Sequence, residues 1–308
     1  MTLMEDGIMR LLIYGAGVIG CWYAILFSKA GYDTTLYARG KRLELFRKEG
    51  LRYEIKGKIH KADVKVIDKL ENEDHYDFIF LTVKENQVHI ALEELASNKS
   101  SNIVTMVNTS EGYENWERLC GEGRIIPAFP GAGGSFKDGI LKAALTPYII
   151  QPTTFAEING CCTERLQKLA RIFKKSKIPY QIVKNMQEWQ LCHLAMVVPI
   201  ADAYYMAQNP QTAWKEADVM QKTAAQMKYN FQTLHKSGIV LSPRKMNMFR
   251  LLPVGLLKIG LIIVFKSDFG DVFMYQHSMN APDEMRTLRE QFYAKNKWKE
   301  MEAERFNE

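Results

Sequence analysis

Apolar and polar residues in the first half of the chain alternate between two kinds of stretch. Short, nearly continuous apolar runs, typical of strands buried on both faces, precede longer segments with apolar residues at helical spacing. The strand-like runs are RLLIYG (10–15), DTTLYA (33–38), DVKVI (63–67), DFIFLTV (77–83) and NIVTMV (102–107). Strands that alternate with helices indicate βαβ units and a parallel sheet covered by helices.

The pattern changes after PYQIV (179–183), the last strand-like run. Helical periodicity without strand alternation then covers 185–207, 212–236, 245–265 and 281–304. We therefore predict an α/β chain, with a doubly wound parallel sheet of the Rossmann type in residues 1–180 and an all-helical domain in residues 181–308. A length of 308 residues suits two domains.

The first predicted strand leads directly into a glycine-rich turn, GAGVIG, and then into a helix. Gly15, Gly17 and Gly20 have GxGxxG spacing, in which the glycines allow a tight turn, a close approach of a pyrophosphate, and close packing of helix on strand. The helix N-terminus adds free N–H groups and a positive dipole end. We expect this turn to bind a dinucleotide through Gly15, Ala16, Gly17, Val18, Ile19 and Gly20.

The end of the second predicted strand distinguishes NAD from NADP. An NAD site places a carboxylate there for the ribose 2′-hydroxyl. This chain instead has LYARGKR, with Arg39, Lys41 and Arg42 and no carboxylate within that segment. The segment favours NADP(H) as cofactor; the alternative is that Arg39 is an ordinary turn cation.

Charge and cysteine content narrow the class of protein. The net charge is +6, with Lys and Arg spread along the chain, so no basic face that would track nucleic acid is expected. The five cysteines form no CxxC pair and no zinc pattern, and residues 1–10 resemble no export signal, so we expect a reducing cytoplasm and no metal. The apolar segment 251–265 is too short to span a bilayer. It predicts a buried helix, or an apolar face covered by a second copy in a homo-oligomer.

Five stretches together resemble the ketopantoate reductase (2-dehydropantoate 2-reductase) family. They are GAGVIG (15–20), YARG (37–40), LTVKENQV (81–88), VNTSEGYENWERL (107–119) and EWQLCHLAMVVPIADAYY (188–205). The resemblance implies a Rossmann domain followed by a helical domain, with the active site between them. It also implies hydride transfer from NADPH to the keto group of a small 2-oxo acid.

Two polar residues match the family's motifs. Lys84 follows the strand FIFLTV, where the family has a lysine beside cofactor and substrate; Asn108 follows NIVTMV, where the family's asparagine contacts the nicotinamide half. Both also stand at carboxyl ends of predicted parallel strands, where open α/β sheets place their ligands. The alternative for each is an ordinary loop residue.

The helix after Trp189 departs from the family pattern. The resemblance implies a proton-donating lysine and two substrate-binding asparagines there, but the matching positions are Leu191, Ala195 and Pro199, or in the other register Gln190, Leu194 and Val198. The family's later serine and glutamate have only approximate counterparts, Ser267 and Glu284. We therefore consider Lys84 and His193 as catalytic acids, although a lone histidine in an apolar helix is more often a hydrogen-bonded core residue.

The rival function is an NADP(H)-binding protein without catalysis. The substrate is not fixed, because the positions that would read it are those that differ.

Overall fold

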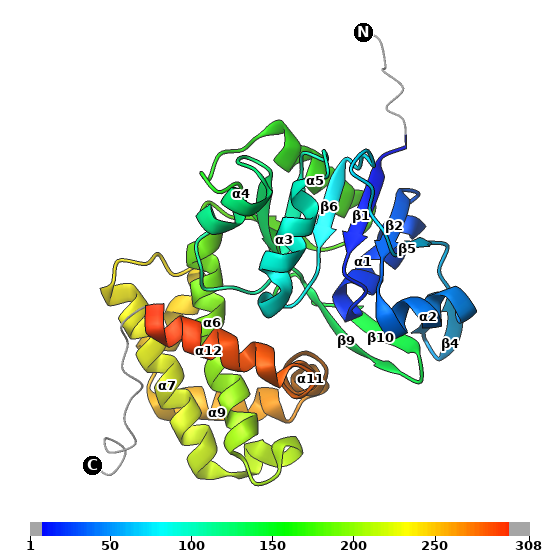
Figure 1. Ribbon diagram of the computed structural model, residues 1–308. Helices are drawn as coiled ribbons and strands as arrows, with labels where there is room; N and C mark the ends of the chain where they lie inside the picture. Colours follow the sequence, from blue (N-terminus) through cyan, green and yellow to red (C-terminus); the bar gives the residue numbers. More distant parts are fainter. Residues whose placement is uncertain (1–7, 296–308) are drawn as a thin grey trace. The chain divides into compact units, whose positions relative to one another are not determined.

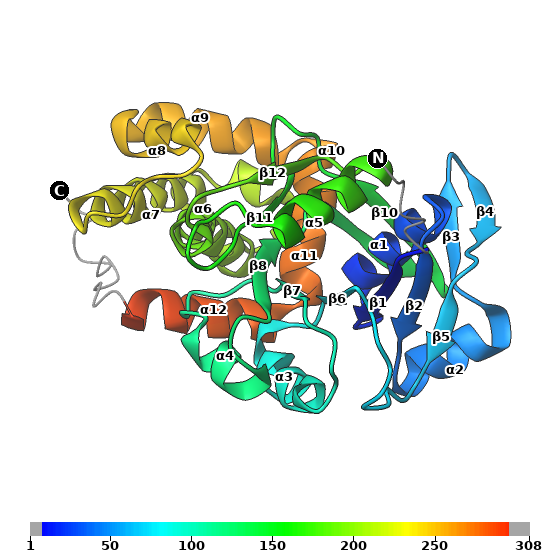
Figure 2. The same ribbon diagram turned by 90° about the horizontal axis from the view of Figure 1, so that it is seen from above.

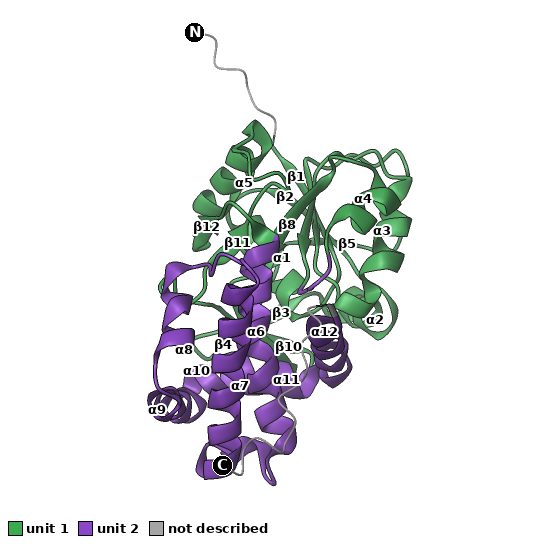
Figure 3. Cartoon of the chain, turned by 90° about the vertical axis from the view of Figure 1, so that its left-hand side faces the viewer, with its two compact units in different colours: residues 1–107, 112–186 green, residues 108–111, 187–308 purple. Residues whose placement is uncertain are grey.

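The computed structural model describes residues 8–295, which form two compact units (Figure 3). Within the described residues, the first contains residues 8–107 and 112–186, and the second contains residues 108–111 and 187–295. The predicted fold class is confirmed: a mainly parallel sheet with helices, followed by a helical region (Figure 1). Within residues 8–295 no helix has the length and hydropathy needed to cross a membrane.

The first unit is built on an eight-stranded sheet, counted over the described residues, with the strand order β12-β11-β8-β7-β6-β1-β2-β5. All neighbours pair in parallel except β8 and β11. The strand order reverses between β1 and β6, which is the place where doubly wound sheets bind ligands. The strands are β1 (Arg10–Tyr14), β2 (Asp33–Tyr37), β5 (Lys65–Ile67), β6 (Phe78–Leu81), β7 (Ile103–Met106), β8 (Ile125–Phe129), β11 (Thr153–Phe155) and β12 (Tyr180–Ile182).

Helices cover both faces of this sheet, as the view from above shows (Figure 2). On one face α1 and α5 share an aromatic core with the sheet, in which Phe27 and Phe173 lie 6.1 Å apart between ring centroids. On the other face lie α3 and α4. Strand β6 is buried at every position, which explains its unbroken apolar sequence. The helices of this unit are α1 (Val18–Lys29), α2 (Gly40–Glu49), the 3₁₀ turn η1 (Glu85–Gln87), α3 (Val88–Ala96), α4 (Glu114–Cys120) and α5 (Glu164–Lys175).

A second, four-stranded sheet in this unit was not among the sequence-based predictions. It consists of two hairpins, β3 (Arg52–Ile55) with β4 (Lys58–Lys61) and β9 (Ala132–Lys137) with β10 (Ile140–Leu145). Each hairpin turns through two residues with positive φ, Lys56-Gly57 and Asp138-Gly139. Turns of this kind match the twist of the strands that they join.

The second unit is helical. Helices α6, α7, α9 and α12 enclose one apolar core. The predicted helix over 245–265 is broken at Pro253, which N-caps α9 because proline cannot continue the preceding helix. The predicted helix over 281–304 is seen to residue 295, and its remainder lies outside the described residues. The elements are α6 (Met186–Met206), η2 (Pro210–Lys215), α7 (Ala217–Lys236), η3 (Arg244–Met246), α8 (Asn247–Leu251), α9 (Val254–Phe265), α10 (Asp268–Gly270), the π-helical turn η4 (Asp271–Tyr275), α11 (Gln276–Asn280) and α12 (Pro282–Lys295).

Helix α6 continues through Pro199. Because proline has no N–H, the carbonyl of Ala195 lacks its usual helical donor. The fully buried side chain of Asn230, on α7, donates to that carbonyl at 3.2 Å. The carbonyl is therefore satisfied from a neighbouring helix.

Helix α9 has two apolar faces. Leu257, Leu261 and Phe265 are buried in the core, whereas the opposite face of the helix is exposed to solvent. The exposed side chains include Leu256, Ile259 and Ile263, which are 55%, 56% and 65% exposed. The expected buried helix is thus buried along one side only.

Candidate active site

The GxGxxG turn lies between β1 and α1 and is packed tightly against the end of β6. Gly15 has φ +124°, and a Cβ there would lie 2.8 Å from the carbonyl oxygen of Thr82. A Cβ on Gly20 would overlap the carbonyl oxygen of Gly15 and the hydroxyl of Thr82. The Thr82 hydroxyl also donates to the Gly15 carbonyl at 2.9 Å. Two of the three glycines are therefore required by the protein's own packing.

The third glycine, Gly17, is different. It is the N-cap of α1, it is exposed, and a Cβ there would meet no atom within 4 Å. No side chain of residues 8–295 caps this helix, so its first N–H groups, those of Val18 and Ile19 among them, have no side-chain acceptor in that range. A bare helix N-terminus with space in front of it suits the phosphates of a dinucleotide.

Arg39, immediately before α2, is engaged with the protein itself. Its guanidinium donates to both carboxylate oxygens of Glu94, at 3.0 and 2.7 Å, and to the Tyr14 hydroxyl at 2.6 Å. It also lies over the rings of Tyr14 and Tyr37, which stack with centroids 4.4 Å apart. No sequence pattern points to Glu94 as a partner of Arg39, because this carboxylate comes from α3, 55 residues further along the chain.

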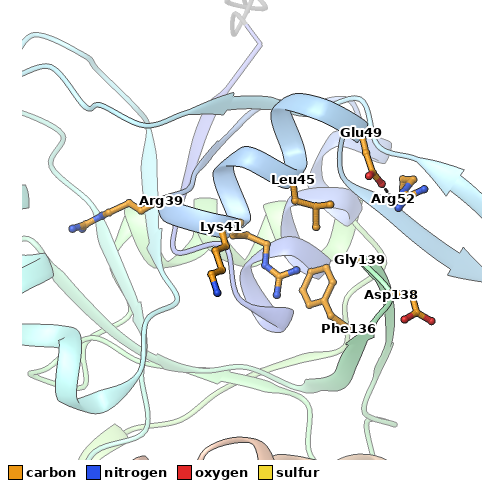
Figure 4. A pocket seen from close by; sticks show the side chains of 9 residues that line it. Arg39, Lys41, Leu45, Glu49, Arg52, Phe136, Asp138 and Gly139 are labelled. Carbon is orange, nitrogen blue, oxygen red and sulfur yellow. Dashed lines mark ion pairs between the residues drawn. The ribbon is translucent and has the colours of Figure 1, made fainter.

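A basic pocket of about 740 Å³ lies beside α2 and the β9–β10 hairpin (Figure 4). Arg42 lines it and stacks on Phe136, with its guanidinium carbon 3.6 Å from the ring centroid. Arg39 borders the pocket, but its side chain points away from Phe136. The remaining lining residues are Lys41, Leu45, Glu49, Arg52, Asp138 and Gly139.

Lys84 and Asn108 follow neighbouring strands of the sheet. Lys84 is an exposed residue three positions after β6, and within residues 8–295 its ammonium group has no hydrogen-bond or ion-pair partner. Asn108, two positions after β7, is buried, and its side-chain oxygen accepts no hydrogen bond from any described residue. A buried amide oxygen without a donor suits a ligand that supplies an N–H group. Asn108 belongs to the second unit by its contacts, and Lys84 belongs to the first.

His193 lies on α6 among buried apolar residues and is only 6% exposed. Burial, assisted by nearby His277, lowers the pKa of His193 to about 3. The imidazole is therefore neutral at neutral pH, and a neutral imidazole is a weak proton donor. Leu191 and Gln190, the two positions at which the resemblance implies a lysine, are both buried.

Ser267 and Glu284 both stand at the N-terminal ends of helices. The Ser267 hydroxyl caps α10, accepting from the N–H of Gly270 at 3.1 Å, and donates to the Val264 carbonyl at 2.6 Å. Glu284 stands in the first turn of α12, where a carboxylate interacts favourably with the helix dipole.

Comparison with known proteins gives a consistent result. The sequence model of the family described as Ketopantoate reductase PanE/ApbA matches residues 11–146. A 2-dehydropantoate 2-reductase of Archaeoglobus fulgidus is 26% identical over 181 residues, 58% of each chain. One of Aquifex aeolicus is 23% identical over 219 residues, 67% of this chain and 68% of that protein. The chain thus aligns with little more than half the length of the Archaeoglobus relative.

Solved structures of the same fold cover far more of the chain. A 2-dehydropantoate 2-reductase from Geobacter metallireducens GS-15 has a TM-score of 0.66 at 15% identity, over 93% of this chain and 100% of that one. D-mandelate dehydrogenase, solved as a ternary structure with NADH and anilino(oxo)acetate, has a TM-score of 0.58 at 16% identity, over 94% and 98%. Residues 11–146 thus match the sequence model of the PanE/ApbA ketopantoate reductase family, and the fold resembles that of a solved 2-dehydropantoate 2-reductase over nearly the whole chain.

Proposed function

We propose that this chain is an NADP(H)-dependent reductase that acts on the keto group of a small 2-oxo acid or a related carbonyl compound. The observation that carries the proposal is the glycine turn, in which Gly15 and Gly20 are packed against the protein while Gly17 faces open space before a bare helix N-terminus. This is the arrangement that a pyrophosphate requires. The D-mandelate dehydrogenase structure, which has the same fold, holds NADH and anilino(oxo)acetate.

Residues of this chain fit both ends of the cofactor. The basic pocket with Lys41 and Arg42 suits a 2′-phosphate, and the buried side-chain oxygen of Asn108 suits the N–H donors of a carboxamide. Bound NADPH would supply the hydride.

We assign to Lys84 the donation of the proton that carbonyl reduction requires. Its ammonium group is exposed and pairs with no described residue, so it can donate to the alkoxide or stabilise its charge. His193 is the second candidate from the sequence, but its lowered pKa leaves the proton-donating imidazolium form unpopulated at neutral pH. The five cysteines of the chain are free thiols, which supports our placing this activity in a reducing compartment such as the cytoplasm.

A substrate screen tests the proposal. Purified protein with NADPH should oxidise the cofactor when given at least one member of a panel of 2-oxo acids that includes ketopantoate. If the protein binds NADPH but oxidises it with no member of the panel, the proposed reductase activity is rejected.

A second function, an NADP(H)-binding protein without turnover, is favoured by one observation. The positions of the family's catalytic lysine are occupied by Leu191 or Gln190, both buried in α6. This alternative predicts tight binding of NADPH, no turnover across the panel, and a Lys84→Met variant that behaves like the parent.

A further inference from the structure

We propose that Arg42, rather than Arg39, binds the 2′-phosphate of the cofactor, and that Glu94 holds Arg39 away from it. The inference rests on the proposed dinucleotide binding and adds the residues that set cofactor selectivity. The spacing of the sequence favours Arg39 for this role. The side-chain contacts favour its neighbour three residues further on.

Arg39 has little left to offer an anion. Both carboxylate oxygens of Glu94 and the Tyr14 hydroxyl accept hydrogen bonds from it within 3.0 Å. The paired arrangement of two N–H groups on one carboxylate is the strongest geometry that an arginine adopts. A phosphate would have to displace Glu94, whose negative charge would then remain nearby. Arg39 therefore contributes less to phosphate binding than its position implies.

Arg42 is in the opposite situation. Its guanidinium stacks on Phe136 at 3.6 Å and also lies 5.8 Å from the Phe46 ring centroid, so its faces are covered while its edge keeps its N–H donors. Among residues 8–295 no acceptor and no carboxylate pairs with it. The side chain is partly buried, and that burial lowers its pKa. A partly buried cation without a counter-ion is a site prepared for an anion.

The pocket places this cation where the phosphate is needed. Arg42 and Lys41 stand in the first turn of α2, the helix that follows β2, and both line the same pocket as Arg39 (Figure 4). The ribose 2′ position is read at the end of the second strand in dinucleotide-binding folds. Phe136 comes from the β9–β10 hairpin, so this hairpin fixes the orientation of Arg42.

Titration of NADPH and NADH against variants tests the assignment. Arg42→Gln should weaken NADPH binding about tenfold to a hundredfold, the loss of a paired Arg–phosphate contact, and leave NADH within about twofold. Arg42→Lys, which keeps the charge but not the paired donors, should fall between Arg42→Gln and the parent. Glu94→Gln should tighten NADPH about fivefold by releasing Arg39, and this gain should vanish when Arg39→Gln is also present. Far-ultraviolet circular dichroism establishes that each variant is folded.

Matched controls separate the local effect from general charge. Arg47→Gln removes an arginine from the same helix whose side chain pairs with Asp68, and Glu93→Gln removes the exposed carboxylate next to Glu94. Both should leave the NADPH-to-NADH ratio unchanged. If Arg39→Gln abolishes the preference for NADPH while Arg42→Gln does not, the assignment is wrong and the proposed function stands. If the parent protein binds neither nucleotide, both are overturned.

Discussion

The imidazole of His193 lies flat against the indole of Trp189, with ring centroids 5.4 Å apart and 6° between the ring planes. The two residues are one turn apart on α6 and both are buried. Burial excludes the imidazolium form, and the charge of His277 acts in the same direction, so the pKa of His193 falls from 6.5 to about 3. His193 thus stabilises the folded protein only while it is neutral.

This pKa difference makes stability depend on pH in a defined window. The unfolded chain takes up a proton on His193 below its ordinary pKa of 6.5, whereas the folded chain does so only near 3. The free energy of unfolding should therefore fall as pH drops through this window, by about 1.4 kcal/mol per pH unit from this group. Urea unfolding at several pH values measures the slope. His193→Gln should lose this contribution, and His235→Gln, at an exposed histidine on α7, should keep it.

The glycines of the turn should respond to substitution in two different ways. Gly20→Ala should lower the free energy of unfolding by about 2–4 kcal/mol, because its Cβ overlaps the Gly15 carbonyl and the Thr82 hydroxyl. Gly17→Ala should cost about 1 kcal/mol or less, because its Cβ meets no protein atom. It should nevertheless weaken dinucleotide binding about tenfold or more, because the methyl group occupies the approach of the pyrophosphate. Thermal unfolding measures the changes in stability, and nucleotide titration measures the change in affinity. Parent-like affinity in Gly17→Ala would mean that the phosphates bind elsewhere.

Exchange of Lys84 should separate catalysis from binding. Lys84→Met should lower kcat about 10²- to 10⁴-fold, the usual contribution of a positioned acid, with a much smaller change in the Kd for NADPH. Lys99→Met, which removes an exposed lysine paired with Glu73, is the control. His193→Gln should keep kcat within about threefold, because the neutral imidazole supplies no proton. A large loss of kcat in His193→Gln alone would reassign the acid.

The exposed face of α9 should govern self-association. An aspartate at Ile259 or Ile263, whose side chains are 56% and 65% exposed, should change the free energy of unfolding by less than about 0.5 kcal/mol. Leu261→Ala, on the buried face, should cost about 2–5 kcal/mol. Sedimentation velocity should show smaller species for Ile259→Asp than for the parent at equal concentration. A monomeric parent would show that this face does not drive homo-oligomer formation.

Local features were predicted from the sequence better than long-range ones. Strand β6 is recognisable from an unbroken apolar run, and the glycine turn from the spacing of three residues. The β3–β4 hairpin was missed because KIHK is mainly polar and exposed at every position and its partner RYEI is only partly buried, so they lack the apolar pattern of a buried strand. In contrast, the break at Pro253 could be predicted from the sequence, because proline cannot continue a helix.

The same division applies to the candidate site. The cations of LYARGKR could be read from the sequence, but which of them is free depends on side chains brought in from elsewhere. Glu94 reaches Arg39 from α3, and Phe136 reaches Arg42 from a hairpin that no apolar pattern predicted. Pairings across such separations exist only once the sheet has brought its strands together.

Pro199 makes a side-chain donor at Asn230 necessary. With Pro199 present, Asn230→Leu would leave the Ala195 carbonyl buried without a donor; with Pro199→Ala, the helix supplies its own N–H to that carbonyl, and Asn230 keeps only its contacts with Gln226 and Tyr293. Homologous sequences should therefore change these two positions in concert, the amide being retained where the proline is retained. Joint variation of two positions 31 residues apart would then reflect the packing of α6 against α7 during the evolution of the fold.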